Sequence, residues 1–577
     1  MARQGRLVRY LPPLAWGRAY DRVTLRHDVV SGLTVGVMIV PQSMAYAALA
    51  GLPPVVGLYA ATVPLLVYAL LGTSGQLAVG PVAISALLTA STVAPLADGD
   101  PARYITLAAV LALLVGGIQV ALGLVRGGVL VNFLSHAVIV GFTSGAALLI
   151  GASQLDTALG VDVEGGQALP GTLAALAGAL AGVNWPTFAV TAAGVAILVG
   201  VRRVARWVPS ALVLVVVATA VSGVFGLDQL GVDTVGDVPA GLPSPSLPVV
   251  SGADLLGLLP GAVAIAIISY AEGISVAKAL AARSRQRLDP DQELRAIGAA
   301  NVSAGVFGGF PVAGGFSRSA VAAEAGARTP LSGAVAAGVV VLAVTALTPL
   351  LVDLPSAALA AIVLVAVVGL VDAKGARGIA RTSPPEGVVL AITFAGTLLL
   401  GVELGLAGGV GASIVAFLWR SADPHIAELG RVEGATVLRN VQRWPVRLDP
   451  RVALLRVDGA LYFASAMRIA DAIRGLVADR PALEAVVLDA SAISQLDASG
   501  AQELEHVAGE LAEAGVALHL ATVRGPVRDV LARIGPSGHL PEERRHATSE
   551  DAIAAVAGPD SPLLRPHPDE PAPEHIQ

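Results

Sequence analysis

The sequence predicts a polytopic α-helical membrane protein that carries a small cytoplasmic α/β domain at its C-terminal end. Of its 577 residues, 55% are hydrophobic and 14% are charged, whereas a soluble domain has about 45–50% apolar and about 25% charged residues. The charge is also uneven, because 38 of the 80 Asp, Glu, Lys and Arg residues follow Arg420. These observations exclude a soluble enzyme with a small anchor and a chain lying wholly within the membrane.

Several classes of function are excluded by composition. The chain has no cysteine, so it has no disulfide, thiolate metal site or cysteine nucleophile. The net charge is −6, and no basic tract with interleaved aromatic residues predicts a nucleic-acid partner. No nucleophile–base pair, phosphate-binding glycine loop or metal cluster stands out, so we expect neither an enzyme nor a cofactor.

Apolar segments of spanning length recur from about Val29 to about Trp419. A span needs about 20 apolar residues, and fewer where the helix is broken or surrounded by protein. Two short segments, 80–94 and 314–327, are interrupted by Gly and Pro and bring the expected total to fourteen. The other twelve lie at 29–48, 54–72, 104–124, 129–153, 186–201, 208–226, 255–279, 294–308, 331–352, 355–371, 386–401 and 403–419.

Loop charges predict that both termini lie in the cytoplasm. Loops after even-numbered spans are basic, as expected on the cytoplasmic side, and the long loop 227–254 on the other side has four Asp and no Lys or Arg. Residues 1–28 then form a basic cytoplasmic lead-in with no cleavable signal. Residues 29–420 form the membrane domain, which we expect in the cell membrane. The basic loop residues are Arg126, Arg202, Arg203, Arg206, Arg283, Arg285, Arg287, Lys374, Arg377 and Arg381.

The two interrupted segments indicate the functional site. Each is the third of a seven-segment half, as in an inverted repeat with paired discontinuous helices. Membrane helices often contain Gly and Pro, so one such segment alone would mean little. Half-helices that meet near the midplane present unpaired N–H groups and positive dipole ends, which favour an anion.

Five stretches resemble the SulP family of anion transporters, which includes prestin and pendrin. They are PQSMAYA (41–47), the signature PPVVGLYAATVPLLVYALLGTSGQ (53–76), LAVGPVAISALL (77–88), EGISVAKALAAR (272–283) and GGFPVAGGFSRSAVAAEAGARTPLSG (308–333). The resemblance covers nearly the whole chain. It implies a seven-plus-seven fold with core and gate domains, a midplane anion site and a homodimer.

The same resemblance assigns substrate-binding residues. Departures from the family pattern at Gly75, Gly315 and Ala322 leave the identity of the anion open. The implied residues are Gln42 and Tyr46 of the first span, Val82 and Ala83 with their free amides after Gly80–Pro81, and Phe316, Ser317 and Arg318 of the tenth segment.

Two charged residues within apolar segments each have two interpretations. Arg318 is either a structural residue, which snorkels to an interface or pairs with Glu324, or the counter-charge of the anion, since a cation at the bilayer centre costs about 2.5–3.5 kcal/mol. The Gly/Pro break before it favours the second. Glu272 either forms a salt bridge with Lys278 or Arg318, or takes up a proton because burial disfavours its charged form. The resemblance places Glu272 beside the anion site and favours proton coupling.

From about Val432 to residue 557 the pattern changes to alternating short strands and helices, which predicts an α/β layer fold. Strands are expected in VALLRVDGALYF, AVVLDAS and ALHLAT, and helices near 465–478, 498–514 and 526–534. The loop LDASAISQLDASGAQEL resembles that of STAS domains, and places Asp497 and Ser499 in it. Ala498 occupies the position phosphorylated in signalling members. Residues 558–577, which are Pro-rich and acidic, are expected to be disordered.

The sequence therefore favours a secondary active transporter of small inorganic anions. Sulfate is the first candidate, carried with H⁺ by an elevator movement of the core within the lipid bilayer. Bicarbonate, chloride or dicarboxylates stay open as substrates, and so does a passive anion channel of the same fold. A membrane sensor that signals through the STAS domain is the alternative from another class, and Ala498 argues against it.

Overall fold

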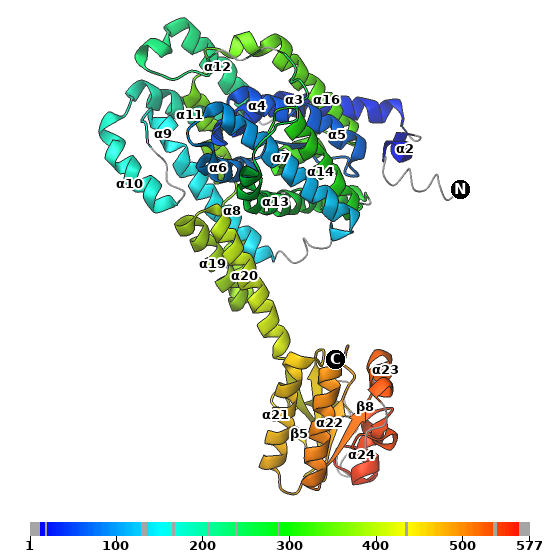
Figure 1. Cartoon of the computed structure of the whole chain (residues 1–577). Coiled ribbons are helices and arrows are strands. Elements are labelled where there is room, and N and C mark those ends of the chain that lie inside the picture. Colours follow the sequence, from blue (N-terminus) through cyan, green and yellow to red (C-terminus); the bar gives the residue numbers. More distant parts are fainter. Residues whose placement is uncertain are drawn as a thin grey trace. The chain divides into compact units, whose positions relative to one another are not determined.

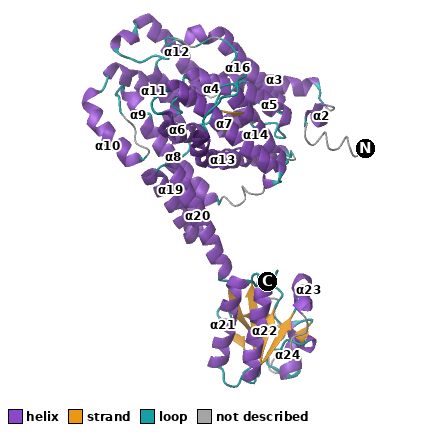
Figure 2. Ribbon diagram, viewed as in Figure 1, coloured by secondary structure: helices purple, strands orange, loops and turns teal. Residues whose placement is uncertain are grey.

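A computed structural model describes the chain except residues 1–11, 18–19, 129–134, 164–167, 206–207, 237–238, 240, 287, 433–434, 436, 535–538 and 565–577. The chain divides into two compact units, Met1–Ser413 and Ile414–Gln577. Figures 1 and 2 show that the first is built from helices and the second from helices and a sheet. Residues 1–11 and 18–19 of the expected lead-in and residues 565–577 of the expected disordered tail lie outside the described residues.

Every one of the fourteen predicted segments overlaps a helix of the first unit, and the prediction of a helical membrane domain is confirmed. Eight helical stretches of the described residues are long and apolar enough to cross a membrane. Helices α2, α9, α10 and α18 lie outside the predicted segments. The helices are α2 (Pro13–Trp16), α3 (Arg22–Leu49), α4 (Pro54–Ala60), α5 (Val63–Leu71), α6 (Ala83–Ala97), α7 (Pro101–Leu124), α8 (His136–Ser153), α9 (Leu155–Leu159), α10 (Leu169–Ala179), α11 (Trp185–Val204), α12 (Ser210–Phe225), α13 (Gly252–Ser284), α14 (Pro290–Val306), α15 (Phe316–Glu324), α16 (Leu331–Leu342), α17 (Ser356–Val368), α18 (Ala373–Thr382), α19 (Pro384–Leu400) and α20 (Val402–Ala422).

Local sequence explains where several of these helices begin. Asp100 and Asp289 each precede a proline at the first helical position, and their carboxylates accept hydrogen bonds from the next free amides. A carboxylate at this position satisfies amides that have no acceptor within the helix, and proline there loses no bond. The D-P pairs therefore start α7 and α14 at these points.

The two interrupted segments meet inside the membrane unit. Strand β1 (Val79–Gly80) pairs antiparallel with β2 (Ala313–Gly314), with Val79 opposite Gly314. Each strand leads into a short helix, α6 after β1 and α15 after β2. The antiparallel pairing of two corresponding segments about 230 residues apart is the arrangement that an inverted repeat with discontinuous helices predicts.

Two fully buried carboxylates fasten the loops that flank these half-helices. Glu293 on α14 accepts hydrogen bonds from Tyr68 Oη (2.9 Å), from both the amide and hydroxyl of Thr73 (2.6 Å each), and from the Ser74 amide (3.0 Å). Asp28 on α3 likewise accepts from the amide and hydroxyl of Thr329 (3.1 and 2.6 Å). Buried charges persist where such hydrogen bonds satisfy them, so these two residues hold the backbone that leads into β1 and out of α15.

The second unit contains one sheet with strand order β4-β3-β6-β7-β8-β9 and β5 paired to β3. Strands β6 to β9 are parallel neighbours, and helices α21 and α22 cover a hydrophobic cluster against them. The bounds are β3 (His425–Val432), β4 (Leu438–Asn440), β5 (Val446–Arg447), β6 (Val452–Asp458), α21 (Phe463–Asp479), β7 (Ala485–Asp489), α22 (Ala498–Glu513), β8 (Ala517–Ala521), α23 (Gly525–Ile534), β9 (Arg545–His546) and α24 (Ser549–Ala557).

The predicted strands and helices of this α/β domain are confirmed, but its limits were wrong. The sheet begins at His425 rather than near Val432, because β3 joins it as an antiparallel neighbour of β6. The start of the expected tail is also wrong. Ser561 is buried and donates a 2.7 Å hydrogen bond to Asp449, and Leu563 is buried in a second hydrophobic cluster. One hydroxyl and one apolar side chain inside a Pro-rich segment therefore anchor the start of this segment on the α/β domain.

Candidate functional site

The structure brings all eight predicted membrane-domain site residues to the wall of one cavity. The cavity has a volume of about 830 Å³ and lies between α3, α6, α11, α13, α15 and α17. Its lining combines few polar groups with many apolar ones, as small-molecule sites generally do. The predicted residues on its wall are Gln42, Tyr46, Val82, Ala83, Glu272, Phe316, Ser317 and Arg318.

Both half-helices begin at this cavity without a side-chain cap. Val82 precedes α6 and Gly315 precedes α15, and neither helix has a capping side chain. The first amides that bond back into their helices are those of Ala86, to Val82, and Ser319, to Gly315. The amides before them have no acceptor within the helix. Two sets of free N–H groups and two positive dipole ends therefore converge on one space.

Arg318 is buried at the same place and is only partly bonded. Arg318 is 2% exposed, and its Nη1 donates a 2.7 Å hydrogen bond to the carbonyl oxygen of Pro81. Nε and Nη2 have no partner among the described residues. A Cβ atom added at Gly315 would lie 2.9 Å from Nη2, so glycine there leaves room beside the guanidinium. Nε and Nη2 form one edge of the planar group, which can bind two oxygens of one anion.

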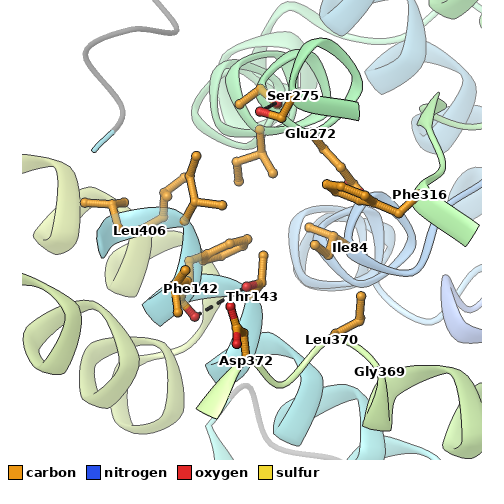
Figure 3. A pocket seen from close by; sticks show the side chains of 15 residues that line it. Ile84, Phe142, Thr143, Glu272, Ser275, Phe316, Gly369, Leu370, Asp372 and Leu406 are labelled. Carbon is orange, nitrogen blue, oxygen red and sulfur yellow. Dashed lines mark hydrogen bonds between the residues drawn. The ribbon is translucent and has the colours of Figure 1, made fainter. Parts of the chain in front are cut away.

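Glu272 lies on the wall of this cavity and of a smaller neighbouring one. The smaller cavity has a volume of about 310 Å³. Figure 3 shows Glu272 and Ser275 on one wall, with Phe316 and Ile84 beside them and Asp372 on the opposite side. Within the described part of the chain, Glu272 Oε2 is buried without a hydrogen-bond partner, and no ion pair joins Glu272 to Arg318 or Lys278.

The remaining predicted residues line the cavity from two helices. Gln42 and Tyr46 are four positions apart on α3 and so share one face. Gln42 is 9% exposed, while Phe316 is 53% exposed and Ser317 is also exposed. The aromatic ring and hydroxyl of α15 thus face open space next to the half-helix N-termini.

One cavity residue was assigned only a topological role by the sequence. Arg202, in the last turn of α11, lines the cavity together with Val195 and Val199. These three residues recur at intervals of four and three, which places them on one helix face. The sequence contains this spacing, which could have placed Arg202 on the same helix face as Val195 and Val199. The cluster of basic residues at 202–206 was instead interpreted as a cytoplasmic loop.

The predicted STAS-loop residues belong to the second unit. Asp497 caps α22: Oδ1 accepts a 2.6 Å hydrogen bond from the Gly500 amide and Oδ2 accepts one of 3.2 Å from the Phe463 amide. Ser499 is exposed in the first turn of α22. Asp497 therefore joins the starts of α21 and α22, which is a structural role. No group of three or more His, Asp or Glu able to hold a metal occurs among the described residues.

Comparison with known families agrees with this architecture. Residues 25–393 match the sulfate permease family and residues 443–552 match the STAS domain. A "probable sulfate transporter" of Mycobacterium tuberculosis is 38% identical over 548 residues, which are 95% of this chain and 98% of the relative. The chloroplastic sulfate transporter 4.1 of Arabidopsis thaliana is 36% identical over 91% of this chain and 79% of its own.

Solved structures show the same fold. Murine solute carrier 26 family member A9, an anion transporter in the inward-facing state, superposes with a TM-score of 0.88 at 24% identity, over 96% of this chain and 95% of its own. The transmembrane domain of a cyanobacterial bicarbonate transporter gives 0.59 at 25% identity, over 69% of this chain and 98% of its own. With a match over most of the membrane unit and relatives that align over nearly its full length, this chain belongs to the sulfate permease family, a family of transporters rather than enzymes, and carries a STAS domain.

Proposed function

We propose that this protein is a secondary active transporter of small inorganic anions, with sulfate as its first substrate. The observation that carries the proposal is the meeting of the Arg318 guanidinium with the uncapped N-termini of α6 and α15 at one cavity. A cation and oriented N–H groups favour an anion at this point. The names of the relatives in Mycobacterium tuberculosis and Arabidopsis thaliana support sulfate in particular.

The chemistry of the site suits a tetrahedral oxyanion. The free Nε–Nη2 edge of Arg318 can donate to two oxygens, and the amides at the starts of the two half-helices can donate to the others. Hydrogen bonds from a guanidinium to an oxyanion are stronger than those between neutral groups. In this scheme the bound anion pairs directly with the edge of Arg318 that has no hydrogen-bond partner among the described residues.

Proton coupling is proposed to run through Glu272. Its carboxylate lines the same cavity as Arg318, and Oε2 has no hydrogen-bond partner among the described residues. An arriving divalent anion repels an ionised carboxylate, so anion binding and protonation of Glu272 favour each other. A proton taken up with the anion then offsets part of the charge that has to cross the bilayer.

An elevator movement is supported by how the helices pack. Helices α7, α13 and α14 pack together, as do α3 and α16, whereas α8 packs on α19 and α11 on α17. The cavity lies between these two groups, with the half-helices on the first and α11 and α17 on the second. We propose that the first group is the moving core and the second the gate, within a homodimer in the plasma membrane.

The test is uptake of radiolabelled sulfate into proteoliposomes at two pH values, with a panel of competing anions. We expect concentrative sulfate uptake that rises as the external pH falls, with weaker competition by chloride than by sulfate. Stronger competition by bicarbonate than by unlabelled sulfate would indicate bicarbonate as the substrate, as in the name of the cyanobacterial neighbour. Sulfate that never accumulates beyond its electrochemical equilibrium would indicate a passive channel instead of a transporter.

A further inference from the structure

We propose that Arg202 forms a second anion subsite on the α11 wall of the cavity that also contains Arg318. The proposal rests on the proposed function, because it concerns the same cavity and the same class of ligand. Arg202 is exposed and lies in the last turn of α11, whereas Arg318 is buried where the half-helices begin. Both residues nevertheless line one cavity of about 830 Å³, Arg202 from α11 and Arg318 from α15.

The geometry of α11 separates Arg202 from the basic residue next to it. Val195, Val199 and Arg202 lie on one face of the helix and line the cavity. Arg203 is one position further, which rotates its side chain by about 100° around the helix axis, and it does not line the cavity. Two adjacent arginines in the same helical turn thus have the same charge but different surroundings.

General explanations for a basic helix end apply equally to both residues. Cations favour the C-terminal turn of a helix because of its dipole, and they favour the side of the membrane that the loop charges assign to the cytoplasm. Neither reason requires a guanidinium on the cavity wall. Within the described part of the chain, no carboxylate forms an ion pair with Arg202, so its charge is available to a ligand.

The chemistry of this subsite favours a divalent oxyanion over a halide. A guanidinium can donate two parallel hydrogen bonds to the oxygens of one oxyanion, which a single chloride ion cannot accept in the same way. Because Arg202 is exposed, its attraction is weakened by salt and holds the anion loosely. A loose, exposed site in the same cavity as a buried one raises the local anion concentration without trapping the anion.

The experiment measures equilibrium binding of radiolabelled sulfate to the full chain in nanodiscs, at low ionic strength and after addition of a bulky organic salt. Arg202→Gln is compared with Arg203→Gln, which removes the same charge from the same turn. We expect Arg202→Gln to weaken sulfate binding by about 3- to 10-fold at low ionic strength and to converge on the wild type as salt screens the charge. Arg203→Gln should stay within about 2-fold of the wild type, since its side chain lies off the cavity.

Two further variants separate the possible outcomes. Arg202→Lys keeps the charge but loses the planar fork, so it should restore most of the salt dependence and only part of the affinity for sulfate. Equal affinities of Arg202→Gln, Arg203→Gln and the wild type, while Arg318→Gln loses binding, would overturn the second subsite and leave the proposed function intact. If Arg318→Gln also binds like the wild type, the proposed function itself fails.

Discussion

At the scale of single residues, Glu272 is the group on which proton coupling depends. We expect Glu272→Gln to bind sulfate with little dependence on pH and to lose accumulation driven by a proton gradient, because the amide cannot exchange a proton. The substitution keeps the size of the side chain, and Oε2 has no partner to lose among the described residues. The measurement is gradient-driven uptake in proteoliposomes.

Glu324→Gln is a suitable control for this experiment. Glu324 ends α15 and is exposed, and it does not line the cavity. The Glu324→Gln protein should accumulate sulfate like the wild type. Equal accumulation by Glu272→Gln and the wild type would remove Glu272 from the coupling step.

A histidine in the second unit predicts a separate effect of pH on stability. His519 on β8 stacks on His546 on β9, with Nδ1 and Nε2 2.9 Å apart. Burial, with a smaller contribution from the charge on His546, lowers the pKa of His519 from 6.5 to about 4. Because the unfolded chain then binds the proton more readily, the stabilisation is present above about pH 6.5 and is lost as the pH falls toward 4.

Denaturant unfolding of the C-terminal unit at pH 7 and pH 5 tests this prediction. After allowance for the half-exposed ring, we expect the wild type to lose about 1 kcal/mol more than His519→Gln between these values. His539→Gln, at an exposed position, should behave like the wild type. An identical pH dependence in His519→Gln would show that the histidine pair does not sense pH.

At the scale of elements, one hydrogen bond links the half-helix α6 to α20, the helix that follows α19 of the proposed gate. Thr92 Oγ1 on α6 lies 2.7 Å from Glu403 Oε1 on α20 and 2.7 Å from the carbonyl oxygen of Leu88. A hydroxyl has one hydrogen to share between these two acceptors. An elevator movement of α6 against α20 has to break the contact with Glu403.

We therefore expect Thr92→Val to favour the conformation in which α6 has moved. The chain has no cysteine, so a single Val195→Cys reporter on the cavity wall can be labelled without background. Thr92→Val should raise its reactivity toward a membrane-impermeant thiol reagent added from the external side. Thr106→Val, which removes an exposed hydroxyl bonded only within α7, should leave labelling unchanged. Unchanged labelling in Thr92→Val as well would show that the Thr92–Glu403 hydrogen bond does not hold α6 in place.

The positions of the elements could be predicted because they depend on local sequence. Apolar length indicated the spans, and Gly and Pro indicated where the third and tenth segments break. The contacts between segments could not be predicted in this way. Glu293 accepts hydrogen bonds from Thr73, and Asp28 accepts them from Thr329, across more than 200 residues. The sequence around each carboxylate does not identify its hydrogen-bond partner.

The candidate site was predictable to a different extent. Arg318 and Glu272 stand out because a charge in an apolar segment is costly. Gln42 and Tyr46, by contrast, were named only through the family resemblance, since a polar and an aromatic residue on a membrane helix have many uses. Arg202 was interpreted only as a cytoplasmic loop charge, and the loop-charge rule does not depend on the direction of the side chain.

At the scale of the whole molecule, the two units have separate hydrophobic interiors. The described residues of the second unit bury their own clusters on both faces of the sheet, and membrane helices satisfy their backbone hydrogen bonds internally. We expect a chain ending at Ala422, the last residue of α20, to insert and to bind sulfate within about 2-fold of the full chain, with reduced transport.

Size-exclusion chromatography and sulfate binding of the truncated chain check this expectation. A monodisperse, inserted protein that has lost all sulfate binding would show that the STAS domain contributes to the anion site. The sensor alternative would gain support from the opposite pattern, in which the truncated chain transports at the full rate and only a cellular response is lost.

The most direct test of the anion site is sulfate binding by Arg318→Gln. Arg318 is buried and its Nε and Nη2 have no partner among the described residues. Its replacement removes a charge from the membrane interior, so insertion should not suffer. With folded protein confirmed by chromatography, we expect Arg318→Gln to bind radiolabelled sulfate at least about 10-fold more weakly than the wild type, which corresponds to about 1.4 kcal/mol. Wild-type affinity in a well-folded Arg318→Gln protein would contradict the assignment of this cavity as the anion site.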